Sequence, residues 1–198
     1  MTRAPVDLGA LIGSRLCHDL VSPLGAISNG VELLQMTGAA TPELGLVADS
    51  VAHANARLRF FRLAFGTAPP TATVRPDEVT GILGDLTAQG RIIFGWRDPV
   101  VLPRPEARLL FLLLLCAETA LPAGGEVAIT RTTDRIEVVA RGPRIAANGP
   151  LWQALGTSEP AIEAGPSEVQ FLLAPEAARG LSRRIRLDLG TERLVLSA

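Results

Sequence analysis

The sequence predicts an α+β fold in which an antiparallel helical hairpin is followed by an α/β sandwich. Residues 7 to 65 carry apolar side chains at helical spacing, with one short break at GAATP. After GTAPPTAT, at about residues 66 to 73, the chain changes to shorter, alternating strand and helix patterns. We therefore expect a hairpin in residues 1–66 and an α/β domain in residues 67–198.

Each helix of the predicted hairpin carries an apolar seam. In the first helix, at about residues 7 to 37, the seam lies opposite His18 and consists of Leu16, Leu20, Leu24, Ile27, Val31 and Leu34. In the second, at about residues 42 to 65, it consists of Leu44, Val47, Val51, Ala54, Leu58, Phe61 and Phe65. One hairpin has too little mutual surface to bury both seams, so we expect a homodimer that forms a four-helix bundle.

The second half predicts helices packed on one mixed sheet. We expect helices near residues 76–88, 105–120 and 167–179, and strands near 91–96, 100–102, 126–132, 135–141, 182–189 and 193–196. Leu109–Ala117 is the most apolar run, and it is too short to span a bilayer. We interpret it as a buried helix.

Composition and charge exclude several classes of function. The 19 basic and 20 acidic residues nearly balance, and no long basic block points to nucleic acid. Two cysteines and two histidines without ligand spacing do not predict a metal site. The sequence has no recognisable secretory signal or membrane span, so we expect a cytoplasmic protein without membrane partners.

A stripe of small and polar side chains lies on the same side of the first helix as His18. It consists of Ser22, Gly25, Asn29, Glu32 and Met36. With Ala26, these residues would leave a flat strip that another protein's helix could approach closely, although ordinary helix packing is the alternative. Neutral imidazole is a nucleophile near pH 7, which makes His18 the candidate nucleophile. His53 has no adjacent acid or proline, and we interpret it as a surface histidine.

The segment CHDLVSPL, at residues 17 to 24, resembles the H-box of histidine kinase dimerisation domains. The pattern H-[ED]-L-x-x-P-L is matched at every specified position, by His18, Asp19, Leu20, Pro23 and Leu24. The hairpin and the domain that follows are similar to the ChpT family of histidine phosphotransferases. This resemblance implies that His18 accepts a phosphoryl group from a receiver aspartate. Asp19 would accept the proton of one ring nitrogen and so fix the tautomer.

The resemblance also implies partners and a docking surface. Antiparallel pairing brings Arg57, Phe61 and Arg62 to the level of His18, where cations could balance an acidic receiver pocket. A solvated helix end with favourable cations is the alternative. The expected partner-binding residues are Arg15, Ser22, Gly25, Ala26, Asn29, Glu32, Arg57 and Arg62. The implied partners are receivers of a CckA-type hybrid kinase and of CtrA-type response regulators, with Mg²⁺ supplied by the receiver.

The second domain resembles a histidine kinase ATP-binding domain that has lost its nucleotide ligands. The asparagine motif N-L-L-x-N-A aligns with Leu112–Ala117, where Cys116 replaces the second asparagine. The loop motif D-x-G-x-G aligns with residues 140–144, where Ala140 replaces the aspartate and Arg144 the second glycine. We therefore expect no stably bound cofactor. A non-enzymatic dimeric scaffold that binds response regulators and an ATP-dependent histidine kinase remain the alternative functions.

Overall fold

The computed structural model describes residues 15, 19, 20, 23, 26, 27, 30, 41–66, 71–157 and 163–198. The described residues before residue 31 are all helical, as expected for the first helix of the hairpin. The other positions of that helix, including most of its predicted seam, lie outside the described residues. No described helix combines the length and the apolar character that crossing a membrane requires.

Helix α2 spans Thr41–Phe65, close to the predicted bounds, and its two ends have different surroundings. Towards its N-terminus the predicted seam is open to solvent, with Leu44, Val51 and Leu58 exposed by 55%, 41% and 47%. Towards its C-terminus the helix is buried, and Phe60 and Phe61 belong to the main hydrophobic core. A single chain therefore leaves the face of α2 with Leu44, Val51 and Leu58 open, while Ser50, Ala54 and the aromatic residues near the C-terminus are covered.

The sheet is mixed, as predicted. Its strands, in spatial order, are β2 (Ile92–Arg97), β4 (Gly125–Arg131), β5 (Ile136–Arg141), β7 (Arg193–Ser197) and β6 (Arg186–Leu189). Strands β2 and β4 run parallel, and the remaining neighbours are antiparallel. Along β4 and β5 alternate side chains are buried, so one face of the sheet points into the core.

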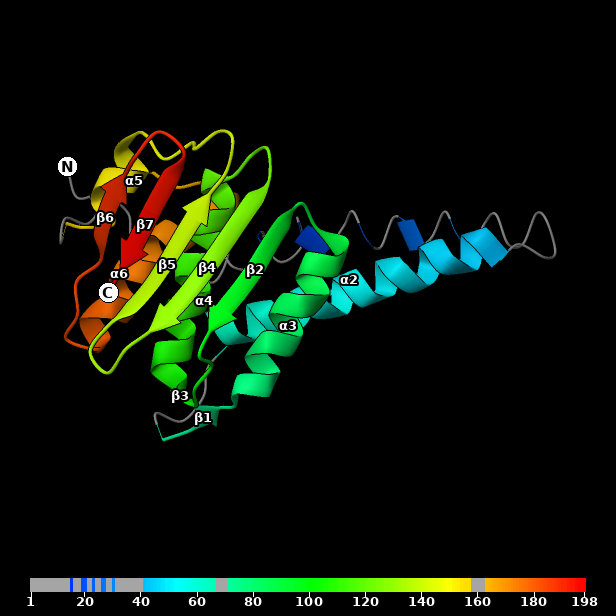
Figure 1. Cartoon of the computed structure of the whole chain (residues 1–198), viewed down its shortest axis with the longest axis horizontal. Coiled ribbons are helices and arrows are strands. Elements are labelled where there is room, and N and C mark those ends of the chain that lie inside the picture. Colours follow the sequence, from blue (N-terminus) through cyan, green and yellow to red (C-terminus); the bar gives the residue numbers. More distant parts are fainter. Residues whose placement is uncertain are drawn as a thin grey trace.

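Helices cover this inner face of the sheet. Figure 1 shows α4 (Arg104–Ala120) and α6 (Gln170–Gly180) behind the sheet, with α3 (Pro76–Gln89) beside β2. The smaller elements are β1 (Thr73–Val74), β3 (Leu102–Pro103), α5 (Pro150–Ala154) and the 3-10 helix η1 (Pro166–Glu168). Strand β1 and helix α5 are too short to give a clear periodic signal, and the sequence did not predict them. The part of the chain from Thr73 onward is called the sheet domain below.

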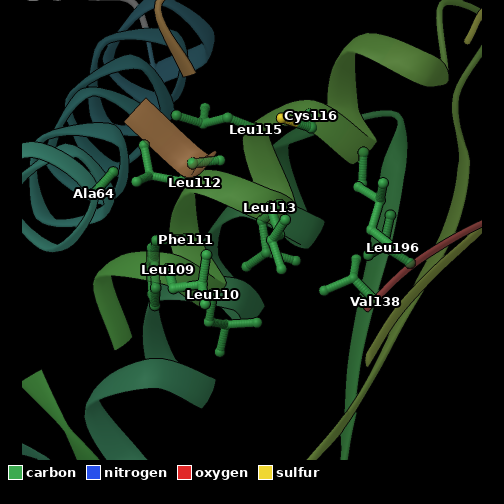
Figure 2. Close-up of a cluster of buried hydrophobic side chains, with 14 of the residues drawn as sticks. Ala64, Leu109, Leu110, Phe111, Leu112, Leu113, Leu115, Cys116, Val138 and Leu196 are labelled. Atoms are coloured by element: carbon green, nitrogen blue, oxygen red, sulfur yellow. The ribbon is translucent and has the colours of Figure 1, made fainter. Parts of the chain in front are cut away.

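Helix α4 is the centre of the core. Every residue of Leu109–Ala117 is at most 1% exposed, which confirms the predicted buried helix. In Figure 2, Ala64 of α2 lies on one side of α4, and Val138 and Leu196 of the sheet lie on the other. A helix that is apolar all round needs cover on all sides, and α2 and the sheet provide it together.

The strand predicted from Ser182 begins four residues later, at Arg186. The intervening residues close the end of α6. Ser182 has a positive φ of 57° and its N–H donates to the carbonyl of Arg179, while the N–H of Arg183 donates to that of Ala178. These bonds satisfy carbonyls that the end of a helix would leave unpaired. The turn therefore uses residues whose alternation resembles a strand.

Arg104 connects the start of α4 to the end of α2. Its guanidinium donates to the carbonyls of Arg62, Leu63 and Gly66, at 2.6, 2.8 and 3.1 Å. These are groups at the C-terminal end of α2, where the helix dipole favours a cation. The side chain is buried, and it contributes a donor to three carbonyls, of which that of Arg62 also accepts from the N–H of Gly66.

We predict that Arg104→Met destabilises the protein by about 2–3 kcal/mol, because buried carbonyls lose a charged donor. Urea unfolding followed by circular dichroism measures this loss. Arg135→Met, which breaks an exposed ion pair with Glu137, is the control and should cost less than about 0.5 kcal/mol. Equal midpoints for the two variants would contradict the role assigned to Arg104.

Candidate functional site

The structure describes some of the predicted site residues and not others. Arg15, Asp19 and Ala26 of the first helix are described, as are Arg57 and Arg62 of α2. The candidate nucleophile His18 and the stripe residues Ser22, Gly25, Asn29 and Glu32 lie outside the described residues. The surroundings of the site are therefore built from the sequence neighbour of His18, Asp19, and from the residues near it.

Asp19 lines a cleft of about 490 Å³ between the helices of the hairpin and the sheet domain. The apolar part of the wall comes mainly from Leu86, Ile92 and Phe94. The charged and titratable residues of the wall are Arg15, Asp19, His53, Arg57, Arg91 and Glu118. A cleft with this lining is suited to polar or charged groups, and it opens beside the H-box.

Arg15 holds Asp19 from the preceding turn of the first helix. Its Nη2 atom lies 2.7 Å from Oδ2 of Asp19, and its Nη1 donates to the carbonyl of Ser167 at 3.0 Å. The guanidinium also lies 6.0 Å from the ring centre of Phe61, within range of a cation–π contact. Arg15, predicted to bind a partner, thus has contacts within its own chain.

Arg57 forms the second polar link across the cleft. Its Nη1 donates to both carboxylate oxygens of Glu118, each at 2.9 Å, and its guanidinium lies 5.8 Å from the ring centre of Phe60. The two ion-paired side chains are only 20% and 12% exposed. Burial opposes the charge of Arg57, but Glu118 and Asp19 outweigh it and raise the pKa of the guanidinium. Arg57 and Asp19 also line the same cleft.

These contacts agree with the predicted antiparallel pairing of the hairpin. Arg15 lies against Phe61, and Asp19 lines the same cleft as Arg57, so the H-box and the C-terminal half of α2 are at one level. Arg62 is at the open end of this region, 67% exposed and 3.2 Å from Glu78. An ion pair this exposed contributes little to stability, so Arg62 can exchange Glu78 for another acidic group.

The structure places His53 differently from its interpretation as a surface histidine. The side chain is half-buried and lines the cleft together with Asp19 and Arg57. Burial and then the charge of Arg57 lower the pKa of His53 below its ordinary value of 6.5, while Glu118 opposes the shift. The interpretation failed because it considered only neighbours in the sequence, whereas Glu118 comes from another helix.

Glu118 and Arg91 are cleft residues that the sequence analysis did not select. Glu118 directly follows the buried run Leu109–Ala117, and an acid at the end of such a run must find a polar partner. This signal marks Glu118 as constrained, but it cannot identify Arg57 as the partner. Arg91 stands at the start of β2 without any pattern that would distinguish it from other exposed arginines.

The positions aligned with the ATP-binding motifs lie in the core or at the surface. Cys116 and Ala140 are both 0% exposed, and burial raises the pKa of the Cys116 thiol. Arg144, the third replaced position, is exposed. The first two positions therefore pack against apolar neighbours and do not line any of the described cavities.

Comparisons with known proteins agree on the type of protein that this chain resembles. The histidine phosphotransferase C-terminal domain family matches residues 76–193. The chain is 32% identical to the protein phosphotransferase ChpT of Brucella abortus (strain 2308), over 100% of this chain and 98% of that protein. A solved structure of a bacterial phosphotransferase aligns with 100% of this chain and 98% of its own, with 30% identity and a TM-score of 0.83.

A histidine kinase domain from Erythrobacter litoralis also aligns, over 93% of this chain and 93% of its own. Its identity is 15% and its TM-score 0.45. The kinase-like character of the sheet domain therefore stays a prediction.

We predict that the pKa of His53 changes when either partner of the ion pair between Arg57 and Glu118 is replaced. Arg57→Gln removes a charge that lowers this pKa, so the pKa should rise, whereas Glu118→Gln removes an opposing charge, so it should fall further. Histidine NMR titration measures both shifts, and the second histidine is identified with a His18→Asn variant. Identical His53 titrations in all the proteins would contradict the assigned surroundings.

The lowered pKa of His53 also sets the direction in which the stability of the fold changes with pH. The folded-state pKa of His53 lies below the ordinary value of 6.5, so protonation favours the unfolded chain. The contribution of His53 to stability is therefore complete above about pH 6.5 and is lost as the pH falls through the folded-state pKa.

Proposed function

Because this chain belongs to the histidine phosphotransferase family, we propose that it relays phosphoryl groups between receiver aspartates through His18. The observation that carries the proposal is the complete H-box match at His18, Asp19, Leu20, Pro23 and Leu24. The position of Asp19 in a polar cleft supports it.

The proposed chemistry consists of two displacements at phosphorus. One ring nitrogen of His18 attacks the aspartyl phosphate of an upstream receiver, so a P–N bond forms and the P–O bond to the aspartate breaks. The aspartate leaves as a carboxylate. In the second step the aspartate of a downstream receiver attacks phosphohistidine, the P–N bond breaks, and neutral His18 is restored. Mg²⁺ bound in the receiver would balance the charge on the phosphoryl group.

Asp19 is proposed to orient the imidazole for this attack. A carboxylate that accepts the proton of one ring nitrogen leaves the other nitrogen free as the nucleophile. The ion pair with Arg15, at 2.7 Å, restricts where this carboxylate can lie. Restriction of this kind favours catalysis, because a displacement of about 1 Å at a reacting group can cost two orders of magnitude in rate.

We propose that receivers dock on the strip formed by Ser22, Gly25, Ala26, Asn29 and Glu32. Small side chains there would let a receiver helix approach the nucleophile closely. Arg62 is exposed and so open to a partner, whereas Arg15 and Arg57 have contacts within the chain and would act on the receiver through Asp19. Receivers of a CckA-type hybrid kinase and of CtrA-type regulators are the proposed partners.

The proposed relay does not use ATP directly. The replacements Cys116, Ala140 and Arg144 remove the ligands that the kinase motifs would supply. The complete burial of Cys116 and Ala140 supports this part of the proposal, because neither position is accessible to a nucleotide. The kinase-like sheet domain would then serve to hold the hairpin and its partner in place.

A homodimer is the proposed working unit. The exposed part of the α2 seam, at Leu44, Val51 and Leu58, supports it, because a second hairpin would bury these side chains in a four-helix bundle.

We predict that His18→Ala abolishes phosphotransfer. The protein is incubated with a phosphorylated receiver and Mg²⁺, and acid-labile phosphate is followed on the protein and on a second receiver. His18→Ala should accept no phosphate while it still binds the receiver. A wild-type protein that binds but never accepts phosphate would favour the scaffold, and labelling of His18 by ATP alone would favour the kinase.

We also predict that Val51→Glu converts the dimer into a folded monomer. Val51 is 41% exposed in the single chain, so the charge meets an apolar surface only in the dimer. Light scattering at micromolar concentration gives the mass, and near-UV circular dichroism of Trp96 and Trp152 reports on the sheet domain. A wild-type protein that is already monomeric would contradict the dimer.

A further inference from the structure

The polar contacts of the cleft connect the first helix to the sheet domain at two points. At one point, Glu118 of α4 binds Arg57, which lines the same cleft as Asp19. At the other, the carbonyl of Ser167 accepts a hydrogen bond from Arg15, which is paired with Asp19. The second connection therefore ends at the carboxylate next to His18 in the sequence, and the first ends at a cation that lines the same cleft.

The two anchor points are joined to each other inside the sheet domain. The side-chain amide of Gln170 donates to the carbonyl of Ser167 at 3.0 Å and to the hydroxyl of Thr119 at 3.1 Å. Thr119 follows Glu118 in α4, and Gln170 is 0% exposed. A shift of α4 relative to η1 would break these bonds. Glu118, which binds Arg57, and Ser167, which binds Arg15, therefore keep a fixed position relative to each other.

The contact between Glu118 and Arg57 restricts the guanidinium strongly. Both carboxylate oxygens lie 2.9 Å from the same nitrogen, and the ring of Phe60 lies beside the guanidinium. With exposures of 20% and 12%, water can replace neither partner fully. Removing Glu118 would leave Arg57 with a largely buried charge and free to change its position.

The fold does not need this ion pair to hold α2 on α4. Apolar contacts already join the two helices, among them the rings of Phe60 and Phe111 at 4.7 Å between centres. The ion pair between Arg57 and Glu118 lies at the edge of this contact, on the cleft that Asp19 lines. It determines where the positive charge of Arg57 lies relative to Asp19.

We infer that Glu118 is a positioning residue for phosphotransfer, which holds Arg57 so that its charge fixes Asp19 beside the nucleophile. The inference rests on the proposed function, because it requires His18 to carry the phosphoryl group. It also gives the sheet domain a direct part in the reaction, through one carboxylate at the end of α4.

The test uses three variants of the full chain. Glu118→Gln removes the negative charge and keeps the shape. Arg57→Glu combined with Glu118→Arg restores the ion pair but replaces the cation on the Asp19 cleft with a carboxylate. Glu106→Gln is the matched control. Glu106 lies on α4 like Glu118, about 18 Å away, its side chain is 11% exposed, and it is paired with Arg131 and Arg183.

Phosphotransfer from a phosphorylated receiver is measured as maximal rate and KM, and stability is measured by urea unfolding. Glu118→Gln should lower the maximal rate at least about ten-fold with the receiver KM unchanged. The charge-swapped variant should recover stability and stay slow. Glu106→Gln should lose as much stability as Glu118→Gln and transfer at the wild-type rate.

Several results would overturn the inference. Glu118→Gln could transfer as fast as the control, or could change KM alone, and either result excludes a positioning role. A charge-swapped variant that transfers at the wild-type rate would reduce the pair to a structural clamp. If the charge-swapped variant does not fold, the transfer rates of Glu118→Gln and Glu106→Gln still show whether Glu118 has a positioning role. In all these cases an inactive His18→Ala leaves the proposed function intact.

Discussion

The burial of α4 on every side is the constraint on which the rest of the structure depends. A helix with the sequence LLFLLLLCA cannot lie on a surface, because too much apolar area would meet water. The sheet covers one side, so another element must cover the opposite one, and the C-terminal half of α2 does so. The hairpin and the sheet domain therefore share one hydrophobic core, with Arg104 closing the end of α2 over the start of α4.

The same helix links the core to the cleft. Its apolar run ends at Ala117, and the next two residues, Glu118 and Thr119, already face the polar groups of the cleft. The position of Glu118 is thus determined by the packing of the residues before it, and the position of Arg57 by Glu118. Because α2 packs on α4 as well, the H-box region of the hairpin is held by apolar contacts and polar contacts from a single helix.

Periodic patterns predicted most of the fold, since they depend only on local spacing. The bounds of α2, α3 and α4 and the central strands agree with the sequence within one or two residues, and the buried character of α4 was evident from its composition. The predicted start of the strand at Ser182 was wrong, because the residues of a turn that ends a helix can alternate between apolar and polar side chains as a strand does. The surface interpretation of His53 was also wrong, because elements distant in the sequence form the cleft that this side chain lines. The pairing of Arg57 with Glu118 was not foreseen, because the two residues are 61 positions apart. The roles of His18 and of the strip around Gly25 stay predictions.

The complete burial of Cys116 and Ala140 has a consequence for the history of such a chain. If ancestral asparagine and aspartate once stood at these positions, the apolar neighbours that now enclose Cys116 and Ala140 leave them no polar surroundings. Restoring either polar side chain alone would now place an unsatisfied amide or carboxylate in a dry interior, at a cost of about 1–3 kcal/mol or more. Neither step would recover a nucleotide site on its own, so each would be selected against. Close packing would then act as a ratchet that makes the loss of ancestral chemistry irreversible.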